Sequence, residues 1–224
     1  MKKWFCYALF FLCSLGIKAQ DVYTVSGGEV IFQSSQVEKD GNDVNTNLRF
    51  TLFLHLGEYL HIDLGDHIGL FSGIGLRNVG LITDQDDVKI KYRTYNLGMP
   101  LALKLGSFKK NLYLFGGAEY EWMVHFKQKI FESGNKTKYT SWFSNRTPDF
   151  IPSAFVGLQF PAGIQLKFRY YLNDYLNHNF KGEGVNEDYT VFDKTQVWYI
   201  SVSFHIRNKE LMNYKTVSSD MALR

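Results

Sequence analysis

The chain has 224 residues, a length that fits one domain, and aromatic residues make up 17% of it. Its formal net charge is +3, but Lys2, Lys3 and Lys18 lie in the N-terminal segment; without these three of the 25 basic residues, 22 basic face 22 acidic residues. This balance gives no electrostatic case for binding nucleic acid. Both cysteines, Cys6 and Cys13, fall in the same segment, which excludes disulfides and cysteine metal sites from the remainder.

The first twenty residues, MKKWFCYALFFLCSLGIKAQ, have the anatomy of a secretory signal. Two lysines precede an apolar run from Trp4 to Ile17, which is short for a transmembrane helix, and Ile17-Lys18-Ala19 supplies a cleavage site. A single N-terminal anchor helix is the alternative. We therefore expect a signal peptide at 1–19, a folded body at 20–206 and a polar periplasmic tail at 207–224.

Apolar residues recur at every second position in the body, which indicates β-strands. In the stretch 48–56, for example, every even position is apolar, whereas Arg49 and His55 occupy odd positions. The pattern predicts eight strands at 22–33, 46–58, 67–81, 90–106, 111–127, 151–161, 164–175 and 195–206. Each is long enough for the roughly 9–11 tilted residues of a membrane-spanning strand.

The connections between these strands alternate in length. Short links are expected at 107–110 and 160–163, with a less clear one at 59–67, and long polar links at 34–45, 82–89, 128–150 and 176–194. Short turns at one end and long loops at the other are typical of an outer-membrane barrel. We therefore predict an all-β fold, an eight-stranded antiparallel transmembrane β-barrel with up-and-down order, in the outer membrane of a Gram-negative bacterium with both termini periplasmic.

A secreted β-sandwich is the alternative, but its outer faces should be plainly solvated. Here the second face of the strands carries Phe53, Phe71, Phe115 and Met123 as well as charges. This mixture favours a narrow, filled barrel lumen.

Two segments resemble a known family. GLFSGIGLRNVG at 69–80 and YNLGMPLALKLG at 95–106, after a signal ending in KAQ, are similar to the PorT-like, porin-family outer-membrane β-barrels of Bacteroidota, with Tyr95, Pro100 and Leu101 matching a recurring strand motif. The resemblance implies fold and location and carries over no catalytic residue. The chain departs from a common barrel pattern because its last predicted strand is followed by the polar stretch Arg207–Arg224 instead of ending on an aromatic residue.

Pro100 lies inside one of the most regular strands. Alternation directs Leu97, Met99, Leu101, Leu103 and Leu105 to the lipid, and Asn96, Gly98, Pro100, Ala102 and Lys104 to the lumen. Proline cannot donate to a sheet ladder, and a barrel has no free edge for it. We therefore predict a local break in ladder pairing around residues 98–101.

The same parity assigns charged residues to the lumen. The expected lumen charge network comprises Arg49, Arg77, Lys104, Glu119, Glu121, Lys167 and Arg169, and the expected lumen histidines are His55, His125 and His205. An eight-stranded barrel has an interior just wide enough for side chains, and buried charges must pair. We expect a salt-bridged plug and no wide pore.

An enzyme acting on lipid and a narrow small-ligand channel are the alternatives to a structural or interaction protein. Glu121 and His125 are about 13 Å apart along one strand, and Ser203 and His205 about 7 Å apart, so neither pair can touch directly. Nucleophile and base must lie within hydrogen-bond reach. We therefore expect no catalytic residues, although a third strand could complete a site.

The long loops provide a second candidate surface. Tyr139, Trp142, Phe143 and Phe150 are large apolar residues in a predicted loop, either a binding or membrane-interface surface or a lid over the barrel mouth. The acidic stretch 84–87 lacks the spacing of an EF-hand, and we expect no metal and no cofactor. Expected partners are outer-membrane lipid, the barrel insertion machinery and a protein bound through the extracellular loops.

Overall fold

The computed structural model describes residues 21–85, 87–182 and 188–213, and only the backbone of 209–213. The predicted signal peptide and the stretch from residue 214 lie outside the described residues. Eleven strands form one sheet: β1 (Asp21–Lys39), β2 (Asn42–Val44), β3 (Arg49–Thr51), β4 (Leu56–Asp63), β5 (Ile68–Gln85), β6 (Val88–Ser107), β7 (Leu112–Glu132), β8 (Asn135–Trp142), β9 (Phe150–Gln159), β10 (Ile164–Tyr171) and β11 (Phe192–Asn213). A short 3-10 turn, η1 (Pro161–Gly163), joins β9 to β10.

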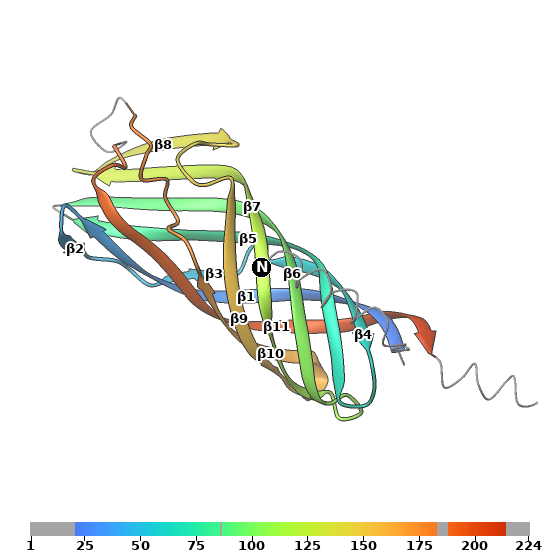
Figure 1. The fold of residues 1–224 in the computed structure, drawn as a ribbon. Coiled ribbons are helices and arrows are strands. Elements are labelled where there is room, and N and C mark those ends of the chain that lie inside the picture. The colour runs from blue at the N-terminus through green and yellow to red at the C-terminus, as the bar shows by residue number, and fades with distance from the viewer. Residues whose placement is uncertain (1–20, 86, 183–187, 214–224) are drawn as a thin grey trace, which may run out of the picture.

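Eight of the strands close into a ring in the order β1, β4, β5, β6, β7, β9, β10, β11 and back to β1, with every pair antiparallel (Figure 1). The remaining strands extend the wall at one end, where β2 and β3 pair with β1 and β8 pairs with β7. Ring closure confirms the predicted eight-stranded antiparallel barrel and excludes the sandwich.

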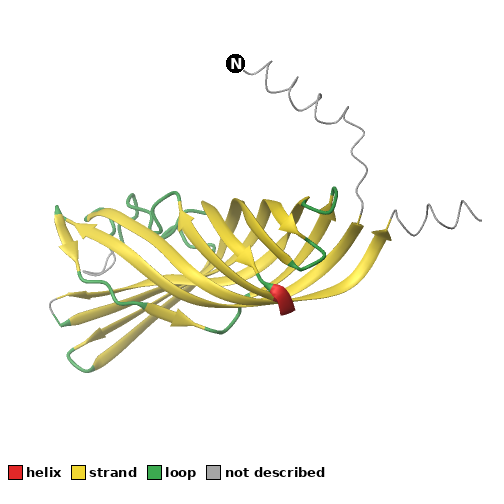
Figure 2. Ribbon diagram, turned by 90° about the horizontal axis from the view of Figure 1, so that it is seen from below, coloured by secondary structure: helices red, strands yellow, loops and turns green. Residues whose placement is uncertain are grey.

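The pairing register sets the tilt of the strands in the barrel. A walk across the paired residues starts at Thr24 of β1, passes through Leu60, Ser72, Leu101, Ala118, Ala154, Tyr170 and Trp198, and returns to β1 at Ser34. The path ends ten residues beyond its start, as the difference between 34 and 24 shows. With a rise of about 3.3 Å per residue and a strand spacing of about 4.8 Å, this stagger corresponds to a tilt of roughly 41°. The oblique strands are seen in Figure 2.

The outer wall carries an apolar belt. On β6, Leu97, Met99, Leu101, Leu103 and Leu105 are 39–64% exposed, whereas the alternate residues from 96 to 104 are buried, as parity predicts. Exposed apolar residues continue the belt around the ring, among them Leu56, Ile74, Leu114, Val156, Leu158, Leu166, Phe168, Ile200 and Phe204. Toward the end opposite the described termini the belt becomes aromatic, with Tyr120, Trp122, Phe150 and Tyr170.

The second predicted strand, 46–58, is wrong as a continuous element. It is divided into β3 and the first residues of β4, and residues 52–55 between them leave the ladder, with Leu54 at a positive φ of 62°. The run Leu52-Phe53-Leu54 is apolar at successive positions, so it lacks the alternation that a paired strand requires.

Most of the predicted long links are strand. β5 and β6 extend to Gln85 and from Val88, and the link 128–150 contains the end of β7 and all of β8, because the hairpins continue beyond the apolar belt. The last strand also continues past its predicted end at 206, since β11 pairs with β1 as far as Asn213 with Asp21. The predicted start of the tail at Arg207 is therefore too early.

The ladder around Pro100 is interrupted on one side only. Pairing of β6 with β7 runs through Pro100 and Glu119, whereas pairing with β5 stops at Ser72–Leu101 and resumes at Gly75–Gly98. The Ser72 hydroxyl donates to the Pro100 carbonyl at 2.7 Å and satisfies this acceptor in the gap. The predicted break thus lies between β5 and β6. Among the described residues, no helix is long and apolar enough to cross a membrane.

Candidate functional site

The middle of the lumen is occupied by a central ion network, which we define as Glu29, Arg77, Glu119, Glu121, Lys167 and Arg169. Its three carboxylates and three cations come from β1, β5, β7 and β10, and no side chain in it is more than 8% exposed. Glu119 contacts both Arg77 and Arg169, and Arg169 Nη1 lies 2.7 Å from Glu121 Oε1. The charges balance, which buried ions require.

Neutral groups complete the hydrogen bonding of these carboxylates. The Tyr171 hydroxyl donates to Glu121 at 2.9 Å, Asn96 Nδ2 donates to Glu121 Oε2 at 2.8 Å, and the Tyr199 hydroxyl donates to Glu29 at 3.1 Å. A buried ion pair offsets its desolvation only when such additional bonds are made. The central ion network is therefore a hydrogen-bonded layer of side chains across the lumen.

Sequence reasoning missed Glu29 in this network. It shares the inward parity of Tyr23, Val25 and Ile31 on β1, which are buried. The signal was present but weak, because Ser26, Gly27 and Gly28 interrupt the alternation just before it.

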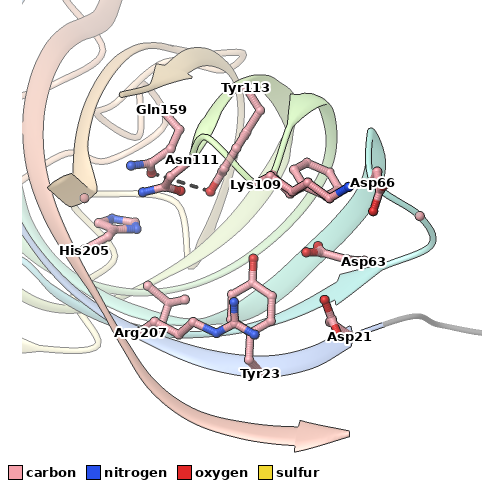
Figure 3. A pocket seen from close by; sticks show the side chains of 14 residues that line it. Asp21, Tyr23, Asp63, Asp66, Lys109, Asn111, Tyr113, Gln159, His205 and Arg207 are labelled. Atoms are coloured by element: carbon pink, nitrogen blue, oxygen red, sulfur yellow. Dashed lines mark hydrogen bonds and ion pairs between the residues drawn. The ribbon is translucent and has the colours of Figure 1, made fainter. Parts of the chain in front are cut away.

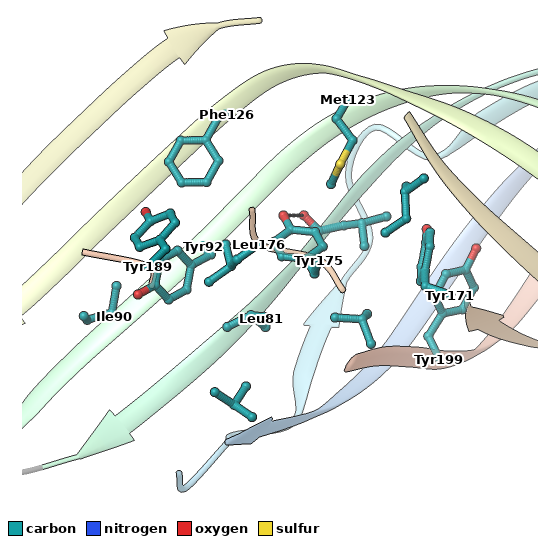
Figure 4. Close-up of a cluster of buried hydrophobic side chains, with 14 of the residues drawn as sticks. Leu81, Ile90, Tyr92, Met123, Phe126, Tyr171, Tyr175, Leu176, Tyr189 and Tyr199 are labelled. Atoms are coloured by element: carbon teal, nitrogen blue, oxygen red, sulfur yellow. Dashed lines mark hydrogen bonds between the residues drawn. The ribbon is translucent and has the colours of Figure 1, made fainter. Parts of the chain in front are cut away.

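On the side of the network away from the described termini, described residues of the loop between β10 and β11 enter the barrel (Figure 4). Tyr175, Leu176 and Tyr189 of this loop are almost fully buried and belong to one cluster with Tyr92 and Phe126 of the wall. The predicted polar link at 176–194 is thus partly core. Its described residues Leu176, Phe180 and Tyr189 pack into the half of the lumen away from the described termini.

The hydroxyl groups of the inserted tyrosines are bonded. Tyr175 donates to Thr94 Oγ1 at 3.1 Å, and Tyr189 donates to Gln128 Oε1 at 3.0 Å. In the outer part of the same loop, the Thr190 hydroxyl and backbone N–H donate to Asp188 Oδ1 at 2.6 and 3.0 Å, which lowers the pKa of that carboxyl. Hydrogen bonds therefore fix the loop both inside the lumen and in its more exposed part.

Arg49 is buried but lies outside the central ion network. Its Nη1 donates to Gln33 Oε1 and to the Asn78 carbonyl, both at 3.0 Å, and its Nη2 donates to Asn78 Oδ1 at 2.5 Å. His55 lies nearby, with Nε2 3.2 Å from Thr51 Oγ1. These amide contacts separate Arg49 from the carboxylates with which it was expected to pair.

Lys104 also lies apart from the central ion network, toward the end where the described chain begins and ends. It is fully buried, contacts Asp63, and places Nζ 3.3 Å from the Tyr23 hydroxyl and 4.6 Å from the centre of the Phe108 ring. Asp63, the last residue of β4, was missed because the pattern left the link 59–67 undefined.

A cavity of about 460 Å³ opens at this end of the barrel (Figure 3), lined in part by Tyr23 and Asp63, which are the partners of Lys104. Its lining is mixed in charge: Asp21, Asp63, Asp66, Lys109, His205 and Arg207, with Tyr23 and Tyr113. Arg207 stacks 3.7 Å from the centre of the Tyr23 ring. Along β7 the inward positions are, in order, Tyr113, Phe115, Gly117 and Glu119, so an aromatic cluster lies between the cavity and the central ion network.

Two of the three predicted lumen histidines face the lumen, and the third does not. His55 is buried in the lumen, and His205 stacks on Tyr59 with ring centres 5.6 Å apart. His125 does not belong to the lumen, because a bulge shifts the β6–β7 register between Tyr95 and Asn96 and turns His125 to the outer face. There it contacts Trp142, with ring centres 4.7 Å apart.

Three of the four predicted surface aromatics lie on the outer wall, and the fourth faces inward. Trp142, Phe143 and Phe150 are 48–66% exposed on the outer wall, where Phe143 and Phe150 stack on Trp122 at 5.3 and 6.1 Å. This placement fits an interface surface and not a lid. Tyr139 faces inward and is stacked by Arg146, whose guanidinium carbon lies 3.8 Å from the ring centre.

No catalytic pair is assembled from the candidates considered. Glu121 faces the lumen and His125 the outside, and within the described residues neither Ser203 Oγ nor His205 Nδ1 has a hydrogen-bond partner. Across the part of the chain that the structure describes, no group of three or more His, Asp or Glu side chains is placed to hold a metal ion.

Comparison with known proteins finds barrels of low similarity. No family model and no curated protein sequence matches the chain. Among solved structures, Neisserial surface protein A is 8% identical with a TM-score of 0.43, over 83% of this chain and 97% of that protein. Ail of Yersinia pestis is 13% identical with a TM-score of 0.36 (84% and 99%), and OprG of Pseudomonas aeruginosa is 10% identical with a TM-score of 0.38 (85% and 98%). All three TM-scores lie below 0.5, so the fold assignment rests on the strand order of this chain.

Proposed function

We propose that this protein is a bacterial outer-membrane β-barrel of the PorT-like, porin-family type, with a filled lumen and a structural or interaction role rather than an enzymatic one. The observation that carries the proposal is the central ion network: six paired, buried charges span the lumen inside an outward-facing apolar belt. With the inserted loop above it, the lumen has no room for a wide aqueous path.

The apolar belt supports a membrane location. Soluble monomers rarely expose continuous apolar patches larger than a few hundred Å². A closed barrel satisfies every ladder group internally, which is the condition for spanning lipid with strands. In this placement the described termini face the periplasm, and lipid, the insertion machinery and a protein bound at Trp142, Phe143 and Phe150 are the proposed partners.

Location and fold are tested on membrane fractions. The protein should be recovered in the outer-membrane fraction and should run at different positions on a gel before and after boiling, because a closed barrel resists detergent until heated. Identical mobility of the two samples, or recovery in a soluble fraction, would contradict the proposal.

The filled lumen is tested in planar lipid bilayers. The purified protein should give no steady conductance steps under conditions in which an open porin, inserted as the control, conducts. Regular large steps from the folded protein would show that the ion network does not close the lumen.

A further inference from the structure

The outer ends of β6, β7 and β8 carry an unusual concentration of positive charge. We define the outer basic patch as Lys91, Arg93, Lys127, Lys129, Lys136 and Lys138. Tyr92, Thr94, Phe126 and Gln128, the strand neighbours of the first four, are buried, so those four side chains point outward. Lys136 and Lys138 are exposed on β8, where they pair with Phe131 and Lys129 of β7.

The register places like charges directly opposite one another. Lys91 pairs with Lys129, Lys129 pairs with Lys138, and Arg93 pairs with Lys127. Directly opposed like charges destabilise a sheet. Within the described residues none of the six forms a salt bridge; Lys91 and Lys136 instead lie 5.2 and 5.7 Å from the centre of the Phe131 ring. The fold alone leaves this repulsion uncompensated.

A cleft of about 220 Å³ lies in the patch, where the ladder between β3 and β5 is missing. Lys91, Arg93, Lys127 and Lys129 line it together with apolar Leu48 and Phe50. A wall of cations beside exposed apolar side chains matches an amphiphile that carries an anionic head.

The position of the outer basic patch along the barrel axis indicates which anionic head group it faces. On β6 the next outward residues toward the other end of the barrel are Tyr95 and then Leu97 of the apolar belt, and on β7 Trp122 occupies the corresponding aromatic level. Aromatic girdles of membrane barrels lie at the level of the lipid headgroups. The patch, just beyond the girdle, therefore faces the phosphate-bearing part of the lipid.

We propose that the outer basic patch binds the phosphate groups of a glycolipid in the outer leaflet, with the acyl chains of that lipid against the belt below. Lysine binds phosphate as a point charge, and Arg93 adds a planar pair of donors. The inference rests on the proposed membrane location and adds to it the class of lipid recognised.

The test uses the full mature chain in detergent and two probes, bisphosphorylated lipid A and the same lipid A after enzymatic removal of its phosphates. Binding is measured by native mass spectrometry. The wild-type protein should prefer the phosphorylated lipid, and a Lys91→Gln, Lys127→Gln, Lys129→Gln variant should lose at least about tenfold in affinity, since each lysine near an anionic surface contributes to binding. A control variant, Lys39→Gln, Lys109→Gln, Lys110→Gln, removes the same charge elsewhere and should bind as the wild type does.

Equal affinity for the two lipids, or an equal loss in the control variant, overturns the proposal. So does full displacement of lipid A by heparin, which would identify a site for soluble polyanions. Folding is monitored by the heat-dependent gel shift; the patch variant should melt at the same or a higher temperature in lipid-free detergent, because repulsion has been removed, and a lower one counts against the proposal. A wild-type protein that shows no gel shift refutes the barrel proposal, whereas a shifted, folded protein without phosphate preference refutes the lipid inference alone.

Discussion

Glu119 joins the two guanidinium groups of the central ion network. Arg77 and Arg169 both contact its carboxylate, and all three side chains are buried. At this scale the lumen is governed by charge balance, because a buried ion that loses its partner cannot recover the lost hydration.

We expect Glu119→Gln, which keeps the shape but removes the charge, to lower the free energy of unfolding by about 3–5 kcal/mol. Denaturant titration followed by the folded gel band measures this loss. Adding Arg77→Gln should recover part of the stability, since charge balance returns. Glu38→Gln, at the outer end of β1, is the control and should have little effect.

Gly98 lies beside this network for steric reasons. A Cβ at Gly98 would come within 2.0 Å of Glu119 Oε1 and 3.0 Å of Arg77 Nη1, whereas a Cβ at Gly116 on the outer face meets nothing closer than 3.4 Å. We expect Gly98→Ala to destabilise the barrel by about 1–3 kcal/mol through overpacking. Gly116→Ala should be close to neutral in the same titration, and equal losses in the two variants would refute the steric argument.

The loop between β10 and β11 supplies side chains that pack the half of the lumen away from the described termini. Its described residues form no helix or strand of their own, yet Tyr175, Leu176 and Tyr189 are buried more deeply than most residues of the strands. Its conformation is set by where these few side chains can be buried.

We expect Tyr175→Ala to cost about 3–5 kcal/mol, because both packing and the bonds to Thr94 and the Val79 carbonyl are lost. Tyr175→Phe removes the hydroxyl alone and should cost only about 0.5–1.5 kcal/mol. The temperature at which the folded band disappears ranks the variants. If the two behave alike, the ring does not plug the barrel.

For the whole molecule, the seam between β1 and β11 determines closure. The two strands pair from Asp21 with Asn213 to Lys39 with Phe192, and the walk around the ring returns to β1 through this seam, ten residues beyond its start. A strand left without its partner exposes an edge that aggregates.

We therefore expect truncation before Arg207 to reduce the yield of folded, heat-shifting protein severalfold, since the first residues of β1 lose their partners and Tyr23 loses its stacked guanidinium. Truncation after Asn213 keeps every described pair of the seam and is the control. Equal folded yields would show that closure needs only the seam above residue 206.

The sequence by itself determined the barrel, the number of strands in its ring and the inward or outward face of most strand residues. These follow from a local two-residue alternation, which is pronounced because one face of each strand meets lipid and the other meets the lumen. Parity placed Arg77, Glu119, Glu121, Lys167 and Arg169 inside, where the structure brings them together with Glu29. Only the tertiary structure decided what breaks or bypasses that alternation. The bulge near Tyr95 turned His125 outward, residues 52–55 left the ladder, and a polar loop placed two tyrosines in the lumen. Register, bulges and loop insertion depend on contacts between strands distant in the chain, which a single-strand pattern does not contain.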